Sequence, residues 1–408
     1  MESSVEPEGA APPVERRSTQ LRWLPTATRL VVRLPALIGL VALAVIGVIR
    51  LPGDDSDVAA RLVEPLQRPL ITADRVEVWA CRVPTDSTAE LYGGLPLRTV
   101  LDVERLASNI GRGVTEYFVG VSHGLYVPTF VAGGEVVLEA ADGYEACVDK
   151  ALAAASPSAT VVLAIADAEH APGLPGGYGS AGIGCAGSEP CAVAESRRYA
   201  YVGASDFAAR WGASPPLDLV EHELGHTLGW VHSGMDIHGS YQSALDVMSN
   251  SAWPRAIDNT RRDAPDTVGV QRLIAGWLRD EEVRVADGAE TITLVPSNTE
   301  PLDLTAAVLG TRLLVLPIDS RTFLTVEVLN ASGYDDHLPG DGVAVHRVRV
   351  SPEDPTLVES IDPLTLDGAP PFDRLLESQG TLTADGWRIV VVEWSTDGWV
   401  VSVDRPTG

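Results

Sequence analysis

Between residues 75 and 281 the hydrophobic positions switch repeatedly between the two-residue period of a strand and the 3.6-residue period of a helix. The pattern predicts, in order, a strand at 76–83, a helix at 102–118, one or two strands at 126–140 broken at Gly133-Gly134, a helix at 144–155, a buried strand at 160–166, a strand at 199–203 and a helix at 267–278. We therefore expect a twisted mixed sheet with helices packed against it, over residues 75–281.

From residue 282 the helical period disappears and short strand-like runs follow one another. They lie at 291–295, 312–317, 323–329, 343–350, 387–394 and 399–403, with Asp397-Gly398 as a hairpin turn between the last two. This alternation predicts an all-β, sandwich-like domain over 282–408. The expected fold class is α+β.

The N-terminal part has a different pattern. Residues 1–33 are rich in Pro, Glu and Arg, which predicts a disordered tail. The sixteen apolar residues 34–49, closed by Arg50, fall short of the roughly 20 residues of a comfortable membrane span. Basic residues anchored at the membrane surface can make up such a deficit. We expect an uncleaved signal anchor at 34–50 and a stalk at 51–74; a cleaved signal peptide is the alternative.

The arginines before the apolar run predict that the N-terminus is cytoplasmic and that everything after residue 50 is extracellular. If the segment is cleaved, the protein is secreted. All four cysteines follow the apolar run, which predicts two disulfides in an oxidising compartment. Cys185 and Cys191 are six residues apart and would close a small loop, which leaves Cys81 to pair with Cys147.

Charge excludes one class of partner. The chain has 408 residues and a formal net charge of −26, so a basic face for nucleic acid is hard to assemble. No GxSxG motif, P-loop or dinucleotide-binding fingerprint is present.

The candidate chemistry lies at residues 222–232, HELGHTLGWVH. His222 and His226 are four residues apart, so a helix places both imidazoles on one face within reach of a single ion. Gly229 can take the positive φ that ends a helix, and the returning chain can bring His232 to the same point. Three protein ligands and an open position are typical of a catalytic Zn²⁺, and Glu223 lies where a general base is needed.

These residues resemble the metzincin signature HExxHxxGxxH. The resemblance implies that His222, His226 and His232 bind zinc and that Glu223 is the general base. It also implies that Met248, in Asp246-Val247-Met248-Ser249, forms the Met-turn beneath the metal. In some metzincins a Tyr two residues after that Met joins the metal shell, but this chain has Asn250 there.

Other parts of the metzincin site are implied more loosely. The family binds the substrate backbone along the sheet edge before the active-site helix, for which Gly176–Gly184 is the candidate; a simple glycine loop is the alternative. Trp253-Pro254 would form one wall of the S1′ pocket. Tyr241 or His238, in the loop before Met248, could approach the site; the simpler expectation is that both are ordinary loop residues.

Residues 322–328 and 333–348 are similar to the region after the protease domain in gametolysin-like and immune-inhibitor-A-like secreted metalloproteases. His232 matches the gametolysin pattern, since immune-inhibitor relatives often have Asp as the third ligand. Asp335, Asp336 and Asp341 offer oxygen atoms for Ca²⁺, with an acidic turn as the simpler interpretation.

Taken together, the patterns and the resemblance predict a membrane-anchored extracytoplasmic zinc endopeptidase that acts on peptide or protein substrates. Two alternatives stay open. One is a non-proteolytic zinc hydrolase on the same scaffold. The other is a binding ectodomain in which the β-domain acts and the protease is vestigial.

Overall fold

The computed structural model describes residues 62–84, 90–91, 95–96, 101–168, 177–180, 197–204, 207, 215–235, 240–299, 310–364, 372–395 and 398–405. All of them belong to one compact unit, Asp54–Gly408. The tail at 1–33, the signal anchor at 34–50, Cys185 and Cys191 lie outside the described residues. Within the ranges above, no helix combines the length and the apolar character that a membrane span requires.

The described elements are a mixture of sheets and a few helices, so the predicted mixture of the two is confirmed. The helices are α3 (Val103–Val121), α4 (Tyr144–Ala154), α5 (Asp218–Thr227), α6 (Trp253–Ile257) and α7 (Gly269–Ile274). The strands are β1 (Ala73–Arg82), β2 (Glu90–Leu91), β3 (Leu95–Pro96), β4 (Val127–Val137), β5 (Val161–Ala166), β6 (Gly177–Ser180), β7 (Arg198–Val202), β8 (Val283–Val285), β9 (Glu290–Leu294), β10 (Leu313–Pro317), β11 (Thr322–Leu329), β12 (Gly342–Val350), β13 (Val358–Pro363), β14 (Thr381–Ala384), β15 (Trp387–Ser395) and β16 (Gly398–Asp404).

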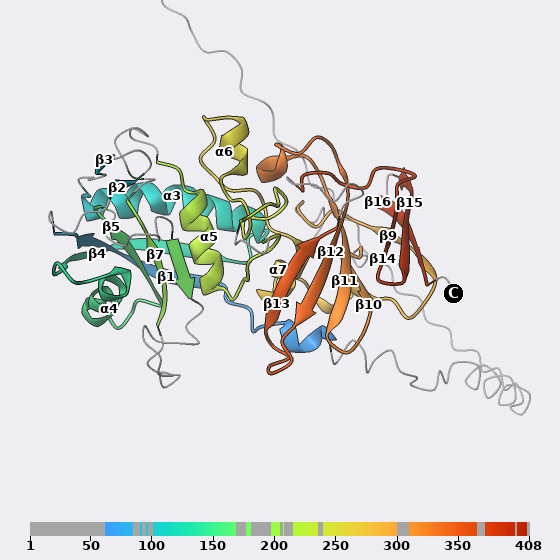
Figure 1. The fold of residues 1–408 in the computed structure, drawn as a ribbon, viewed down its shortest axis with the longest axis horizontal. Helices are drawn as coiled ribbons and strands as arrows, with labels where there is room; N and C mark the ends of the chain where they lie inside the picture. Colours follow the sequence, from blue (N-terminus) through green and yellow to red (C-terminus); the bar gives the residue numbers. More distant parts are fainter. Residues whose placement is uncertain are drawn as a thin grey trace, which may run out of the picture. The chain divides into compact units, whose positions relative to one another are not determined.

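The first sheet has the order β4-β1-β5-β7-β6 (Figure 1). β4, β1, β5 and β7 are parallel, and the edge strand β6 is antiparallel to β7. Alternate residues of β1 belong to two hydrophobic clusters: Val76 and Val78 pack with α3 and α5, whereas Trp79 packs with α4. The helices therefore cover both faces of the sheet, as expected for a sheet that is mainly parallel.

A disulfide between Cys81 of β1 and Cys147 of α4 fastens α4 to the sheet, with the two Cα atoms 5.7 Å apart. This confirms the pairing predicted from the spacing of the cysteines.

The later strands form two further sheets, β13-β12-β11-β10-β8 and β14-β15-β16-β9. Side chains of β11 alternate between two hydrophobic clusters. Leu324 and Val326 pack with residues of the β14–β16 sheet, whereas Phe323 and Leu329 belong to the cluster that contains α3 and α5. One hydrophobic core thus runs across the predicted domain boundary at 281/282.

Residues 62–72, which the sequence assigns to the stalk, pack against the rest of the unit. Leu62, Val63 and Leu66 are buried in the same cluster as α3 and α5. The amide of Arg68 donates to the carbonyl of Ile274 at 3.1 Å. The prediction of a stalk therefore does not describe this segment, because Leu62, Val63 and Leu66 are part of the core.

Two predicted elements differ from the observed ones. β4 is a single strand, and its register shifts where Gly133 makes room for the indole of Trp79. Helix α7 ends before the predicted 278, because the chain turns at Gly276 with a φ of +71°. Strands β8, β13 and β14 were not predicted from the pattern; β13 carries a bulge that breaks its two-residue period.

Glu327 of β11 is fully buried on the face that packs toward α7. Its carboxylate accepts from the amide of Gly269 at 2.8 Å and from the hydroxyl of Ser297. Burial nevertheless raises its pKa from 4.5 to about 7, because desolvation outweighs these hydrogen bonds.

A raised pKa means that the folded state holds this proton more tightly than the unfolded state. Its contribution to stability is present below pH 4.5 and is lost as the pH rises through about 7. Glu327→Gln removes this dependence. Relative to wild type, its unfolding free energy should shift upward by up to about 3 kcal/mol between roughly pH 5 and pH 8. Urea unfolding at both pH values tests this; a constant difference between the two proteins would contradict it.

Candidate metal centre

The first two histidines lie one turn apart on α5, with ring centroids 5.0 Å apart. Nδ1 of His222 donates to the carbonyl of Val247 at 2.7 Å, and Nδ1 of His226 donates to the carbonyl of Trp230 at 2.9 Å. A proton on Nδ1 leaves Nε2 of each neutral ring as a free lone pair. The two carbonyls therefore set the tautomer and orientation that a metal ligand needs.

The third histidine is brought back by a tight turn. Helix α5 ends at Thr227, and Gly229 follows with a φ of +91°, as predicted for this glycine. Gly225 allows a close approach below the helix: a Cβ there would lie 2.7 Å from Sδ of Met248. The turn at Gly229 brings Nε2 of His232 to 2.9 Å from Nε2 of His226.

The three histidines can hold a metal ion, since one ligand atom of each lies within 4.8 Å of the others. Burial lowers the pKa of all three rings, that of His232 to about 4, so they stay neutral near pH 7. Without a cation, Nε2 of His232 can carry the ring proton and donate it to Nε2 of His226; with a cation present, both atoms can offer it lone pairs. Zinc–nitrogen distances of about 2.0–2.1 Å bring ligand atoms of one ion about 3.3 Å apart, close to this separation.

Glu223 lies next to the first ligand and is 4 % exposed. Its Oε2 has no hydrogen-bond partner among the residues that the structure describes. Burial raises the pKa of this carboxyl well above its ordinary value. Burying an unpaired carboxylate costs free energy, so we expect a nearby cation or water molecule to be its partner.

Tyr241, expected to be an ordinary loop residue, lies beside the three histidines. Its hydroxyl is 3.1 Å from Nε2 of His232, and its ring centroid is 5.7 Å from that of His222. A bridge between Met235 and Tyr241 holds this part of the loop. The sequence carried no spacing signal for Tyr241, because the loop conformation decides its position. His238, the other loop candidate, lies outside the described residues.

The chain on both sides of His232 is held by side chains that sequence reasoning missed. Gln271 of α7 donates to the carbonyl of Val231 at 2.5 Å and accepts from its amide at 3.3 Å. Asp246 accepts from the hydroxyl of Ser233 at 2.6 Å. The amide of Ser233 also donates to the carbonyl of Met248 at 3.0 Å, so the predicted Met-turn supports the third ligand directly.

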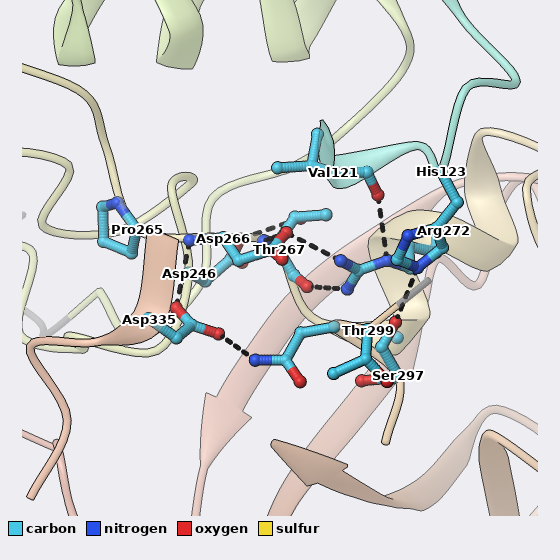
Figure 2. A network of polar contacts seen from close by, with 12 residues as sticks. Val121, His123, Asp246, Pro265, Asp266, Thr267, Arg272, Ser297, Thr299 and Asp335 are labelled. Carbon is cyan, nitrogen blue, oxygen red and sulfur yellow. Dashed lines mark hydrogen bonds and ion pairs between the residues drawn. The ribbon is translucent and has the colours of Figure 1, made fainter. Parts of the chain in front are cut away.

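A buried polar network connects this region to the later strands (Figure 2). The guanidinium of Arg272 is fully buried and donates to Asp266 at 2.7 Å and to the carbonyls of Val121 and Thr267. Thr267 in turn donates to Asp246 at 3.1 Å. The segment 246–249 is thereby linked through α7 to the end of α3.

The structure does not bring the three calcium candidates together as ligands. Asp335 is buried and accepts from the amide of Asp266 and from Asn298. Asp336 pairs with Arg261, and Asp341 accepts from the amide of Ala331. Across the described ranges, the three histidines are the only cluster of His, Cys, Asp or Glu with metal-binding geometry.

A cavity of about 330 Å³ adjoins the centre. His226 and His232 line it together with residues 358–362 of β13. Here the amide of Gly234 donates to the carbonyl of Ile361 at 2.8 Å, so β13 is joined to the segment that follows the third ligand. Trp253 and Pro254, proposed from the sequence as a pocket wall, begin α6 and do not line this cavity.

Comparison with known proteins adds no family. No family model matches the chain, and no curated protein matches it in sequence. A solved structure described as "Structure of a chaperone-substrate complex" is 13 % identical, with a TM-score of 0.26. The match covers 50 % of this chain and 34 % of that one, so this chain spans about a third of its length. A likeness this distant supports no conclusion on fold or function.

Replacing Gln271 by Ala removes both hydrogen bonds to Val231 and loosens the segment that carries His232. We expect affinity for a divalent metal ion to fall about tenfold, the lower end of the effect of a supporting residue. Competition with a chelator measures it. Gln67→Ala is the matched control, because the Gln67 amide also binds a backbone carbonyl, that of Leu278 at 3.0 Å, outside the centre. Equal affinities for both variants would remove Gln271 from this role.

Proposed function

We propose that this chain is a zinc-dependent endopeptidase of the metzincin type. The observation that carries the proposal is the convergence of three neutral imidazoles beside a buried carboxylate oxygen without a partner. A structural metal site closes its shell with four protein ligands, whereas a catalytic site leaves one position open. Three histidines next to an unpaired Glu223 correspond to the second kind.

The donor set favours zinc. All three donors are imidazole nitrogens, and the one described disulfide lies elsewhere, between Cys81 and Cys147. When bound, zinc supplies a Lewis acid that polarises the scissile carbonyl and lowers the pKa of a water molecule.

The side chains of the chain would carry the proton transfers. Glu223 takes a proton from the attacking water and later gives it to the leaving amine. Tyr241 would donate a hydrogen bond to the carbonyl oxygen as negative charge develops there.

Several features support the metzincin architecture. Parallel strands β1, β4, β5 and β7 precede the metal-binding helix α5, and the antiparallel edge strand β6 contacts it. Met248 is fully buried next to Gly225 beneath the two helical histidines. β6 lies within the glycine-rich segment proposed from the resemblance to bind the substrate backbone, and a sheet edge can do so by strand addition.

The cellular location belongs to the same proposal. A disulfide between Cys81 and Cys147 is stable outside the cytoplasm. The apolar run at 34–49 with arginines before it would anchor the chain with the peptidase on the extracellular side.

Glu223→Gln should retain zinc but lose peptide hydrolysis by at least about 100-fold, because a neutral amide cannot accept the proton of water. Zinc content and cleavage of a mixed peptide library by the oxidised full-length chain are the two measurements. Glu104→Gln, a change of an exposed carboxylate on α3, is the control and should leave both unchanged. Hydrolysis that persists in Glu223→Gln would refute the mechanism.

Tyr241→Phe removes one hydroxyl beside His232. We expect kcat to fall by about ten- to 100-fold with little change in KM, because the lost hydrogen bond forms mainly in the transition state. Tyr334→Phe is the control, since Tyr334 packs on Tyr117 with ring centroids 4.8 Å apart and lies outside the centre. A rise in KM with unchanged kcat would show instead that Tyr241 binds substrate in the ground state.

A further inference from the structure

The cavity beside the histidines is lined by two kinds of side chain. Trp230, Val231 and Met235, from the segment that carries the third histidine, are apolar. Strand β13 contributes Glu359, Ser360 and Asp362, together with two apolar residues. No lysine or arginine lines it. The cavity therefore brings the histidines, apolar side chains and carboxylates together around one space.

The carboxylates on β13 are available to a ligand. Glu359 is exposed at the bulge of the strand, and Asp362 is half-buried and accepts only a long hydrogen bond, 3.4 Å from the hydroxyl of Ser360. Arg347 lies opposite Asp362 on β12, but its guanidinium binds Asp385 at 2.7 Å. Arg349 lies opposite Ser360 and is exposed to solvent.

The bulge in β13 contributes to this arrangement. Arg349 pairs with Ser360 but Val350 pairs with Val358, so Glu359 is an extra residue in the ladder. Bulges turn a side chain away from its regular alternation and often occur beside functional sites. Val358 and Ile361 stay buried in the hydrophobic core, which holds the strand in place while Glu359 remains exposed.

We propose that this cavity is a substrate subsite for a lysine or arginine side chain of the peptide. The proposal rests on the peptidase function above and names its preferred substrate. A long cationic side chain can lay its aliphatic stem along apolar walls and extend its charged head to carboxylates. Glu359 and Asp362 would attract that head, and His226 and His232, which line the same cavity, would place the scissile bond next to the residue that carries it.

The subsite is built by two parts of the chain that are far apart in sequence. Ser233 and Gly234 are joined to Ile361 by a β-bridge and a hydrogen bond, so the segment after the third histidine and β13 lie side by side. The sheet of β8 and β10–β13 would therefore take part in substrate selection rather than form an independent module.

The test uses peptide hydroxamates, which bind an active-site metal whether or not the enzyme turns over. Two ligands differ only in the residue next to the hydroxamate: one carries arginine, the other its neutral isostere citrulline. Calorimetry on the zinc-loaded full-length chain gives both dissociation constants. We expect the arginine ligand to bind about five- to tenfold more tightly, and this ratio to fall with added salt, as for a pair of partly exposed charges.

Glu359→Gln, and the double variant with Asp362→Asn, should reduce the ratio toward one. Glu353→Gln is the matched control, because Glu353 is an exposed carboxylate of the turn between β12 and β13 and does not line the cavity. It should keep the wild-type ratio. Equal affinities in wild type, or a ratio unchanged in the double variant, would overturn the subsite.

The two proposals fail in different ways. If the arginine hydroxamate is preferred but no peptide is cleaved, the subsite stands as a recognition site and the peptidase function falls. If peptides are cleaved with no preference for arginine or lysine next to the scissile bond, and the hydroxamates bind equally, the subsite alone falls. The salt dependence in wild type needs no variant, so misfolding of a variant cannot obscure the result.

Discussion

Two hydrogen bonds from imidazole Nδ1 atoms to backbone carbonyls orient two of the three candidate metal ligands. They hold His222 against Val247 and His226 against Trp230, and they leave the Nε2 lone pairs directed at a shared point. Both acceptors lie outside α5, one in the segment 246–249 and one beyond the turn at Gly229. The geometry of the ligands therefore depends on how the chain leaves the helix and returns beneath it.

The support of that return path comes from buried polar groups. Gln271 holds the backbone before His232 and Asp246 holds the residue after it, while Arg272 links α7 to α3. Each of these groups is costly to bury and is stable only because it is hydrogen-bonded. The hydrophobic core contains both α5 and the sheet that carries Glu327, so the metal centre and the later strands are one folded unit.

The sequence predicted well the elements that depend on neighbouring residues and predicted poorly those that depend on residues far away in the chain. Helices α3 and α4 and strands β5, β11 and β12 were predicted closely, since local periodicity reflects which face is buried. The helix at 267–278 was predicted too long because Gly276 turns against the backbone of Arg68, a residue about 200 positions away. The sequence pattern did not predict strand β13, because its bulge breaks the alternation of apolar and polar residues. It did not assign Tyr241 to the site, because the position of a loop residue follows no fixed spacing.

The sequence by itself predicted the candidate ligand set, the turn at Gly229 and the pairing of Cys81 with Cys147, and it marked Glu223 as the candidate general base. The first and the last of the three histidines are ten positions apart, so helical pitch and one flexible glycine suffice to bring them together. Only the tertiary structure decided that Tyr241 reaches His232, that Gln271 holds Val231 and that β13 lines the same cavity as His226 and His232. The physical reason is that these contacts join segments through packing of a shared core, which leaves no periodic trace in either segment.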